Sequence, residues 1–173
     1  IEGIRKPDGT VYLIQRHAPG DRPRTIPHAL AARAAEHPER DWLKQRNPET
    51  DQWEAITYGE GLRRSRALAQ AFLDMGAGPE SPVMILSGNS IETAMVMMAA
   101  MTVGAPAAPI SVPYSLMSTD FEKLKHCFNA VKPKVLFAAQ LPPFVPAIAA
   151  LGDHGCTVIT ADGVNGAVSY QGL

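Results

Sequence analysis

The chain has 173 residues, a length that fits one domain or one domain with a small additional segment. Hydrophobic residues make up 46% of it and charged residues 19%, which is the composition of a soluble globular protein. The formal net charge of -1 gives no electrostatic footprint for nucleic acid, so no nucleic-acid partner is expected.

The chain shows no signal peptide and no membrane span. Its longest apolar run, residues 94–103, is too short to cross a bilayer, so we expect a cytoplasmic protein without a membrane partner. The first residue is Ile1 and not methionine, which suggests a piece of a longer protein.

Residues 1–56 are expected to form an N-terminal extension with a helix and a β-hairpin. The segment "PDGTVYL" predicts a turn followed by a short strand. In "TIPHALAARAAEHPE", Thr25 is a suitable helix cap, Pro27 sits in the first turn, and Pro38 ends the pattern. Two short strands around the polar turn at residues 47–51 predict the hairpin.

From residue 57 the pattern changes to an amphipathic helix. Thr57 and Glu60 have the spacing of a capping box, and Gly76 follows the last apolar residues of the helix. Arg63, Arg64 and Arg66 are expected on the solvated face. The predicted inner stripe consists of Leu62, Ser65, Ala69, Phe72 and Leu73.

Short apolar strands then alternate with helices up to the end of the chain. The strands are "PVMIL", "APAAPI", "KVLFAA" and "TVIT", and Asn89 with Glu92, then Thr119 with Glu122, have the spacing of helix caps between them. The segment "PPFVPAIAALGDHG" predicts a last short helix. Residues 57–173 therefore predict an α/β fold with a mostly parallel sheet and helices on both faces.

One predicted helix, after residue 90, is apolar on nearly every side. Such a helix has no water-facing stripe if it lies between the sheet and another layer. Its four methionines suit irregular packing better than metal binding, and they are Met95, Met97, Met98 and Met101.

Sequence signals for a reaction centre are weak. Neither GxxxxGK[ST] nor GxGxxG occurs, and no zinc spacing appears, so no metal ligand is predicted. Cys127 and Cys156 lack CxxC spacing and are expected as thiols. The turn at residues 87–90 stands between a strand and a helix, where it either binds an anion or simply caps the helix.

These segments together resemble the N-terminal part of the adenylate-forming acyl-CoA synthetases, the AMP-binding superfamily that includes luciferases. The family landmark L-T-Y-x-E-L is matched by "ITYGEG" at residues 56–61, with Gly61 in place of the closing leucine. "MTVGAPAAPI" resembles its turn into a proline-ended strand, and "NSIE" is similar to its N-S-x-E helix start. "PISVPYSLMSTDFEKLKH", "KPKVLFA" and "PDGTVYL" look most like the bacterial feruloyl-CoA synthetases.

The resemblance implies a ligase that uses ATP with Mg and transfers the acyl group of a carboxylic acid, here a hydroxycinnamate, to coenzyme A. The family's phosphate loop and catalytic lysine would lie beyond Leu173, so no catalytic or cofactor-binding residue is carried over and the segment alone is expected to be inactive. At most, Tyr114, Ser115 and Leu116 would border the acyl pocket.

The resemblance also implies a partner, the C-terminal portion of the same chain, and self-association of the isolated piece. Two other interpretations stay open at this stage. In the first, the chain is a free-standing α/β ligand-binding or interaction module. In the second, it is part of an adenylating enzyme with another acyl acceptor.

Overall fold

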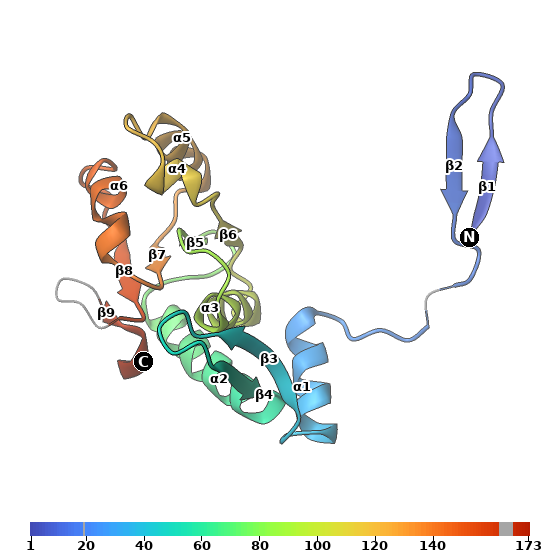
Figure 1. Cartoon of the computed structure of the whole chain (residues 1–173), viewed down its shortest axis with the longest axis horizontal. Helices are drawn as coiled ribbons and strands as arrows, with labels where there is room; N and C mark the ends of the chain where they lie inside the picture. The colour runs from blue at the N-terminus through green and yellow to red at the C-terminus, as the bar shows by residue number, and fades with distance from the viewer. Residues whose placement is uncertain (19, 163–167) are drawn as a thin grey trace.

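A computed structural model describes residues 1–18, 20–162 and 168–173 of the chain (Figure 1). Within that part no helix is both long enough and apolar enough to cross a membrane. The strands are β1 (Glu2–Arg5), β2 (Val11–Ile14), β3 (Asp41–Arg46), β4 (Trp53–Thr57), β5 (Val83–Ile85), β6 (Ala107–Pro109), β7 (Val135–Ala138), β8 (Thr157–Thr160) and β9 (Val168–Ser169). The helices are α1 (Ile26–Glu36), α2 (Tyr58–Asp74), α3 (Ile91–Thr102), α4 (Pro113–Leu116), α5 (Glu122–Val131), η1 (Pro142–Phe144), α6 (Val145–Ala149) and η2 (Tyr170–Gly172).

The centre of the molecule is a five-stranded parallel sheet with the strand order β6-β5-β7-β8-β9. Side chains alternate between its faces, because successive residues of a strand point to opposite sides. In the segment that contains β5, Val83 and Ile85 belong to the core on one face, and Met84 and Leu86 to the core on the other. The predicted α/β fold with a mostly parallel sheet is confirmed.

The proline-containing strand β6 lies at the edge of the sheet. Pro109 pairs with Ile85 in the parallel register, although it has no N–H to donate. An edge strand has a neighbour on one side only, so a proline there costs fewer ladder hydrogen bonds than in a central strand. This position explains why "APAAPI" forms a strand in spite of its prolines.

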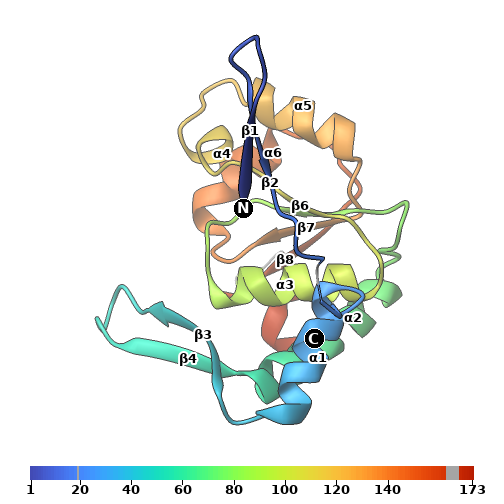
Figure 2. The same cartoon turned by 90° about the vertical axis from the view of Figure 1, so that its right-hand side faces the viewer.

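Helix α3 lies between the sheet and a second layer, as the sequence predicted. Figure 2 shows it crossing the molecule between the strands and a group formed by α1, α2 and the β3–β4 hairpin. Met95 and Val96 are fully buried, and Thr102 at the end of the helix is its one exposed residue. Burial of each such apolar side chain stabilises the fold by about 1.5–3 kcal/mol. The predicted role in core packing is confirmed for Met95 and Met98, which are buried, and for Met97, which packs against the core, whereas Met101 is half-buried and lines a cavity beside α1.

Helices α4, α5 and α6 cover the opposite face of the sheet (Figure 1). Leu124 of α5, Phe144 of η1 and Ala147 of α6 pack there against Leu136 of β7. Both faces of the parallel sheet are therefore covered by helices, which is the usual condition for such a sheet to be stable in water.

Two predicted helix caps are wrong by one or two residues. Helix α3 is capped by Ser90, whose hydroxyl accepts a hydrogen bond from Thr93 N at 3.0 Å, and not by Asn89. At α5, Ser118 accepts from the amide of Phe121 and Asp120 accepts from the amide of Glu122. The predicted cap Thr119 does neither, because its polar neighbours on both sides hold the amides.

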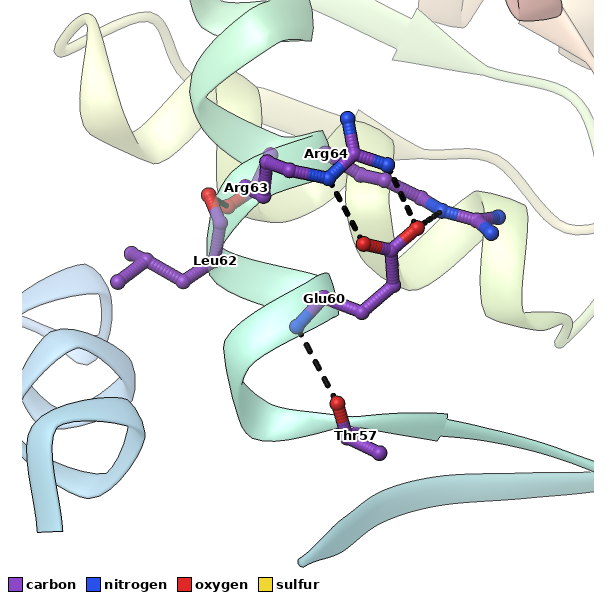
Figure 3. A network of polar contacts seen from close by, with 6 residues as sticks. Thr57, Glu60, Leu62, Arg63 and Arg64 are labelled. Carbon is purple, nitrogen blue, oxygen red and sulfur yellow. Dashed lines mark hydrogen bonds and ion pairs between the residues drawn. The ribbon is translucent and has the colours of Figure 1, made fainter. Parts of the chain in front are cut away.

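Helix α2 begins as predicted, since Thr57 Oγ1 accepts from Glu60 N at 3.2 Å. Figure 3 shows that the Glu60 carboxylate turns to Arg63 and Arg64. The predicted inner stripe is wrong at one residue: Leu73 is 52% exposed, while Leu68, which the prediction left out, is 3% exposed.

The first residues form a hairpin of two strands, β1 and β2, where the sequence predicted a turn and one strand. The turn is held by Asp8, whose carboxylate accepts from Thr10 N at 3.0 Å, and by Gly9 with a φ of 87°. Figure 1 shows this hairpin apart from the other elements. Every residue of both strands is exposed.

The predicted β3–β4 hairpin is confirmed, and it packs on α2 through an aromatic side chain. The Trp42 ring lies so close to Gly61 that a Cβ atom there would be 2.5 Å from Cε3. Trp42 also stacks on Tyr58, with 6.1 Å between ring centroids. Gly61 therefore replaces the leucine of the family pattern at the point where the indole ring meets the helix.

Gly61→Ala tests this contact. Alanine favours a helix by about 1 kcal/mol over glycine, whereas overpacking against the ring costs about 1–3 kcal/mol. We expect Gly61→Ala to lower the free energy of unfolding by about 1 kcal/mol in urea titrations. In a Trp42→Ala background the same change should raise it by up to about 1 kcal/mol. An effect of equal sign in both backgrounds contradicts the contact.

The Glu60 cluster predicts a pH dependence of stability. Hydrogen bonds from Arg63 and then Arg64 lower the pKa of Glu60 from 4.5 to about 2. A carboxylate whose folded pKa is depressed stabilises the fold above its unfolded pKa, and the contribution is lost as the pH falls from about 4.5 to about 2. The side chain is 32% exposed, so solvent screening limits the effect to less than about 1 kcal/mol.

We therefore expect Glu60→Gln to be less stable than the parent chain at pH 7 and equally stable near pH 2, in chemical unfolding followed across this range. Glu122→Gln, which removes one exposed ion pair with Lys125, is the matched control and should show a smaller loss at pH 7. A loss for Glu60→Gln that persists at pH 2 would point to packing and not to the carboxylate.

Candidate functional site

The candidate site lies where the parallel strands end. β5, β7 and β8 run in the same direction, so the segments that follow them meet at one edge of the sheet. The chain passes from β5 to β6 on one side and then returns to β7 on the other side. Segments that leave the sheet in opposite directions at such a switch point leave a crevice between them, which is the common ligand site of open α/β sheets.

A cavity of about 540 Å³ opens at this edge. We call it the crevice. Its walls come from the β3–β4 hairpin, from the turn after β5 with the first turn of α3, and from the segments after β7 and β8. Its lining residues are Gln45, Arg46, Pro48, Ser87, Gly88, Asn89, Ser90, Glu92, Ala139, Gln140, Phe144, Ala161 and Asp162.

Hydrogen bonds tie together the segments that follow the strands. Ser87, which is 8% exposed, accepts from the backbone N–H of Ala139 and so joins the ends of β5 and β7. The Asp162 carboxylate accepts from Leu141 N at 2.8 Å and from the Thr160 hydroxyl, which joins the ends of β7 and β8. Side-chain hydrogen bonds therefore link the carboxyl ends of all three strands, β5 to β7 and β7 to β8, at the crevice.

The turn at residues 87–90 is the start of a capped helix. Thr93 N donates to Ser90, and Thr93 Oγ1 donates to Gly88 O at 2.8 Å. The amide of Ile91, the first residue of α3, donates to Gln45 Oε1 at 2.7 Å. Two amides that an anion would use are thus already engaged. Of the two sequence interpretations, the structure favours the cap over the anion site.

The charges around the crevice do not fit a nucleotide phosphate either. Glu92 and Asp162 bring carboxylates to its lining, and Arg46 is held by Asp51 with 2.6 Å between Nη2 and Oδ2. Phosphate sites present cations and free backbone amides instead. The described residues of this crevice are thus poorly suited to a triphosphate, because they offer carboxylates and an arginine that is already paired.

A second cavity, of about 510 Å³, adjoins the crevice and shares Glu92 and Ala161 with it. Arg63 and Arg64 stand at its rim and are held by Glu60 (Figure 3). Burial raises the pKa of Tyr170 to about 12, an effect that the nearby Arg64 guanidinium partly offsets. The phenol is therefore neutral at physiological pH.

The predicted pocket-border residues lie at the same edge of the sheet, in α4 after β6. A Cβ atom on Gly88 would be 3.9 Å from Val112, so the segment before α4 touches the turn of the crevice. Tyr114 is half-buried under Lys123, whose Nζ lies 5.4 Å from the ring centroid, while Leu116 is exposed. The structure brings Tyr114, Ser115 and Leu116 near the crevice but not into its lining.

Ser115 is the unusual member of this group. Its hydroxyl is buried and has no hydrogen-bond partner among the residues that the structure describes. A buried hydroxyl without a partner is costly, and such groups deserve a functional or structural explanation. Ser115 lies beside the exposed Leu116, and the acceptor or donor for its hydroxyl is not among the described residues.

The two cysteines, Cys127 and Cys156, are free thiols, as the sequence predicted. Burial raises the pKa of Cys156, which makes it a poor nucleophile. In residues 1–18, 20–162 and 168–173, no group of three or more His, Cys, Asp and Glu side chains has the arrangement of a metal site.

Sequence reasoning missed several lining residues. Gln140 and Asp162 come two residues after the ends of β7 and β8, so the rule that ligands bind beyond the carboxyl ends of parallel strands would have found them. Gln45 gave no such signal, because it lies in a hairpin far from the strands in sequence and reaches the crevice only through tertiary packing.

Comparisons with solved structures place the fold. The chain is similar to the fatty acyl-adenylate ligase from L. pneumophila, solved with acyl adenylate and pyrophosphate, with a TM-score of 0.63 and 18% identity over 80% of this chain and 23% of that one. A protein of Rhodopseudomonas palustris CGA009 assigned as a long-chain-fatty-acid CoA ligase has a TM-score of 0.70 and 19% identity over 86% and 35%. A benzoate CoA ligase from Burkholderia xenovorans LB400 has a TM-score of 0.65 and 16% identity, over 84% of this chain and 27% of that one.

The chain thus spans between about a quarter and a third of the length of these three structures, and at such identities they support the fold alone. None of the curated protein sequences compared with the chain matches it. The family model for AMP-binding enzymes matches residues 30–170, which is most of the chain. This chain belongs to the family of AMP-binding enzymes.

Proposed function

We propose that the chain is the N-terminal part of an ATP-dependent acyl- or aryl-CoA ligase. Membership of the AMP-binding family supports this proposal, as does the likeness of the fold to acyl- and aryl-activating ligases. The proposed reaction joins the carboxylate of an acid to AMP with release of pyrophosphate, after which the thiol of coenzyme A displaces AMP. Residues for the phosphate and magnesium steps would come from beyond Leu173.

The proposed acid is a hydroxycinnamate such as ferulate. The observation that carries this choice is the sequence from β6 to β7, where "PISVPYSLMSTDFEKLKH" and "KPKVLFA" resemble feruloyl-CoA synthetases. In the structure this segment contains α4 at the carboxyl edge of the sheet. An apolar ring suits the exposed Leu116 and Met117 there.

The proposed partner of the chain is the remainder of a longer ligase. Several large apolar side chains are exposed on the described part, and Leu116, Met117, Val145 and Val168 are among them. Where exposed apolar side chains form a contiguous patch, they often mark a contact with another polypeptide. By the same reasoning the isolated chain is proposed to self-associate, and residues 57–173 to be one incomplete portion of the large N-terminal domain.

The test uses the full-length ligase that carries this sequence. We expect it to exchange pyrophosphate with ATP in the presence of ferulate and to form feruloyl-CoA, while the 173-residue chain does neither. Ligase activity with fatty acids but not with ferulate would reject the hydroxycinnamate. Turnover by the isolated chain would reject the proposal that it lacks the catalytic groups.

A variant tests the proposed acyl border. Leu116→Ala in the full-length ligase removes exposed apolar contact area, and we expect the KM for ferulate to rise about fivefold to tenfold, which corresponds to about 1–1.4 kcal/mol of lost contact. The KM values for ATP and coenzyme A should stay the same. Leu73→Ala, at a leucine of α2 that is 52% exposed against 45% for Leu116, is the matched control. An unchanged KM for ferulate removes Leu116 from the pocket.

A further inference from the structure

The hairpin and helix α3 meet at one side chain. Gln45, in β3, accepts a hydrogen bond through Oε1 from the amide of Ile91 at 2.7 Å. Ile91 is the first residue of α3, where the backbone amide has no acceptor within the helix. The bond therefore joins segments 46 residues apart in the chain and satisfies a group that the helix itself leaves open.

A carboxylate on the paired strand orients the Gln45 amide. Glu54 lies opposite Gln45 in the antiparallel register, and its carboxylate accepts from Gln45 Nε2 at 3.3 Å and from Asn47 Nδ2 at 2.7 Å. A carboxylate can only accept and the Ile91 amide can only donate, so a single orientation of the Gln45 amide satisfies both. Hydrogen bonds from Asn47 and then Gln45 lower the pKa of Glu54 and keep it charged.

The two segments that Gln45 joins both line the crevice. Gln45 and Arg46 line it from the hairpin, while Asn89, Ser90 and Glu92 line it from the start of α3. A change in the distance between hairpin and helix would therefore change the shape of the cavity. The same bond also occupies the amide of Ile91, which keeps that donor from the crevice.

We propose that Gln45 is a positioning residue of the crevice, which fixes the hairpin against the first turn of α3 through the chain of contacts Glu54–Gln45–Ile91. The claim that these contacts shape a substrate site rests on the proposed ligase function. The chain of contacts itself is independent of that function, so the two are tested by separate measurements.

The first measurement is amide hydrogen exchange at Ile91 in the 173-residue chain. Gln45→Met keeps the length of the side chain but removes both hydrogen-bonding groups, and we expect exchange at Ile91 to become about fivefold faster, the equivalent of one ordinary hydrogen bond. Gln52→Met, at the exposed tip of the same hairpin, is the matched control and should leave the rate unchanged. An unchanged rate in Gln45→Met overturns the proposal.

A reciprocal exchange of side chains separates this chain of contacts from general packing. Gln45→Glu alone places two carboxylates side by side and should also speed exchange at Ile91. In the double variant Gln45→Glu with Glu54→Gln, the new carboxylate at position 45 accepts from the Ile91 amide and from the new side-chain amide at position 54. The exchange rate at Ile91 should therefore return to within about twofold of the parent chain. Failure of the double variant to recover, in a chain that is folded by circular dichroism, overturns the proposed orientation.

The second measurement is kcat/KM of the full-length ligase with ferulate, ATP and coenzyme A. Gln45→Met should lower it about fivefold, and Gln45→Glu with Glu54→Gln should restore it, because the shape of the crevice follows the same contacts. Faster exchange at Ile91 with unchanged kcat/KM overturns the positioning role. If the parent ligase is inactive, the proposed function is rejected. The exchange rates at Ile91 then test, without the activity, whether Gln45 fixes the hairpin against α3.

Discussion

The structure depends on covering a parallel sheet on both of its faces. The strands β5, β7 and β8 carry apolar side chains toward both sides, and β7 is fully buried along its length. Such strands are stable only when helices exclude water from each face. On one side α3 does this, and because α1, α2 and the β3–β4 hairpin cover α3 in turn, this helix has almost no face toward water.

The same constraint produces the crevice. Parallel strands need crossover connections, and the reversal of direction between β6 and β7 sends neighbouring segments away from each other at the carboxyl edge. Ser87 and Asp162 hold the floor of the resulting space by bonds to backbone amides. The walls belong to elements that are distant in sequence, so the shape of the crevice depends on tertiary contacts and not on a local motif.

The sequence was most informative where periodicity decides the structure. Continuous apolar segments gave the strands, and the all-apolar segment after Ser90 gave a helix between two layers. Local hydrogen bonding was harder to predict, because Asn89 and Ser90, or Ser118 and Thr119, are adjacent polar residues that compete for the same amides. Leu73 was misplaced because a step of one residue after Phe72 rotates it off the buried side of α2.

The long-range contacts had no signal in the sequence, with one exception at Gly61. There the chain departs from the leucine of the family pattern, and the structure shows the Trp42 ring in the space that a side chain on α2 would need. The ring comes from β3, which also carries Gln45, so the close contact between the Trp42 ring and Gly61 also places the residue that bonds to α3. The division of the chain at residue 56 stays a prediction from the sequence pattern, but side chains pack across it. The β3–β4 hairpin before residue 56 lines the crevice. Helix α2 after it carries Gly61, which lets the Trp42 ring of the hairpin approach.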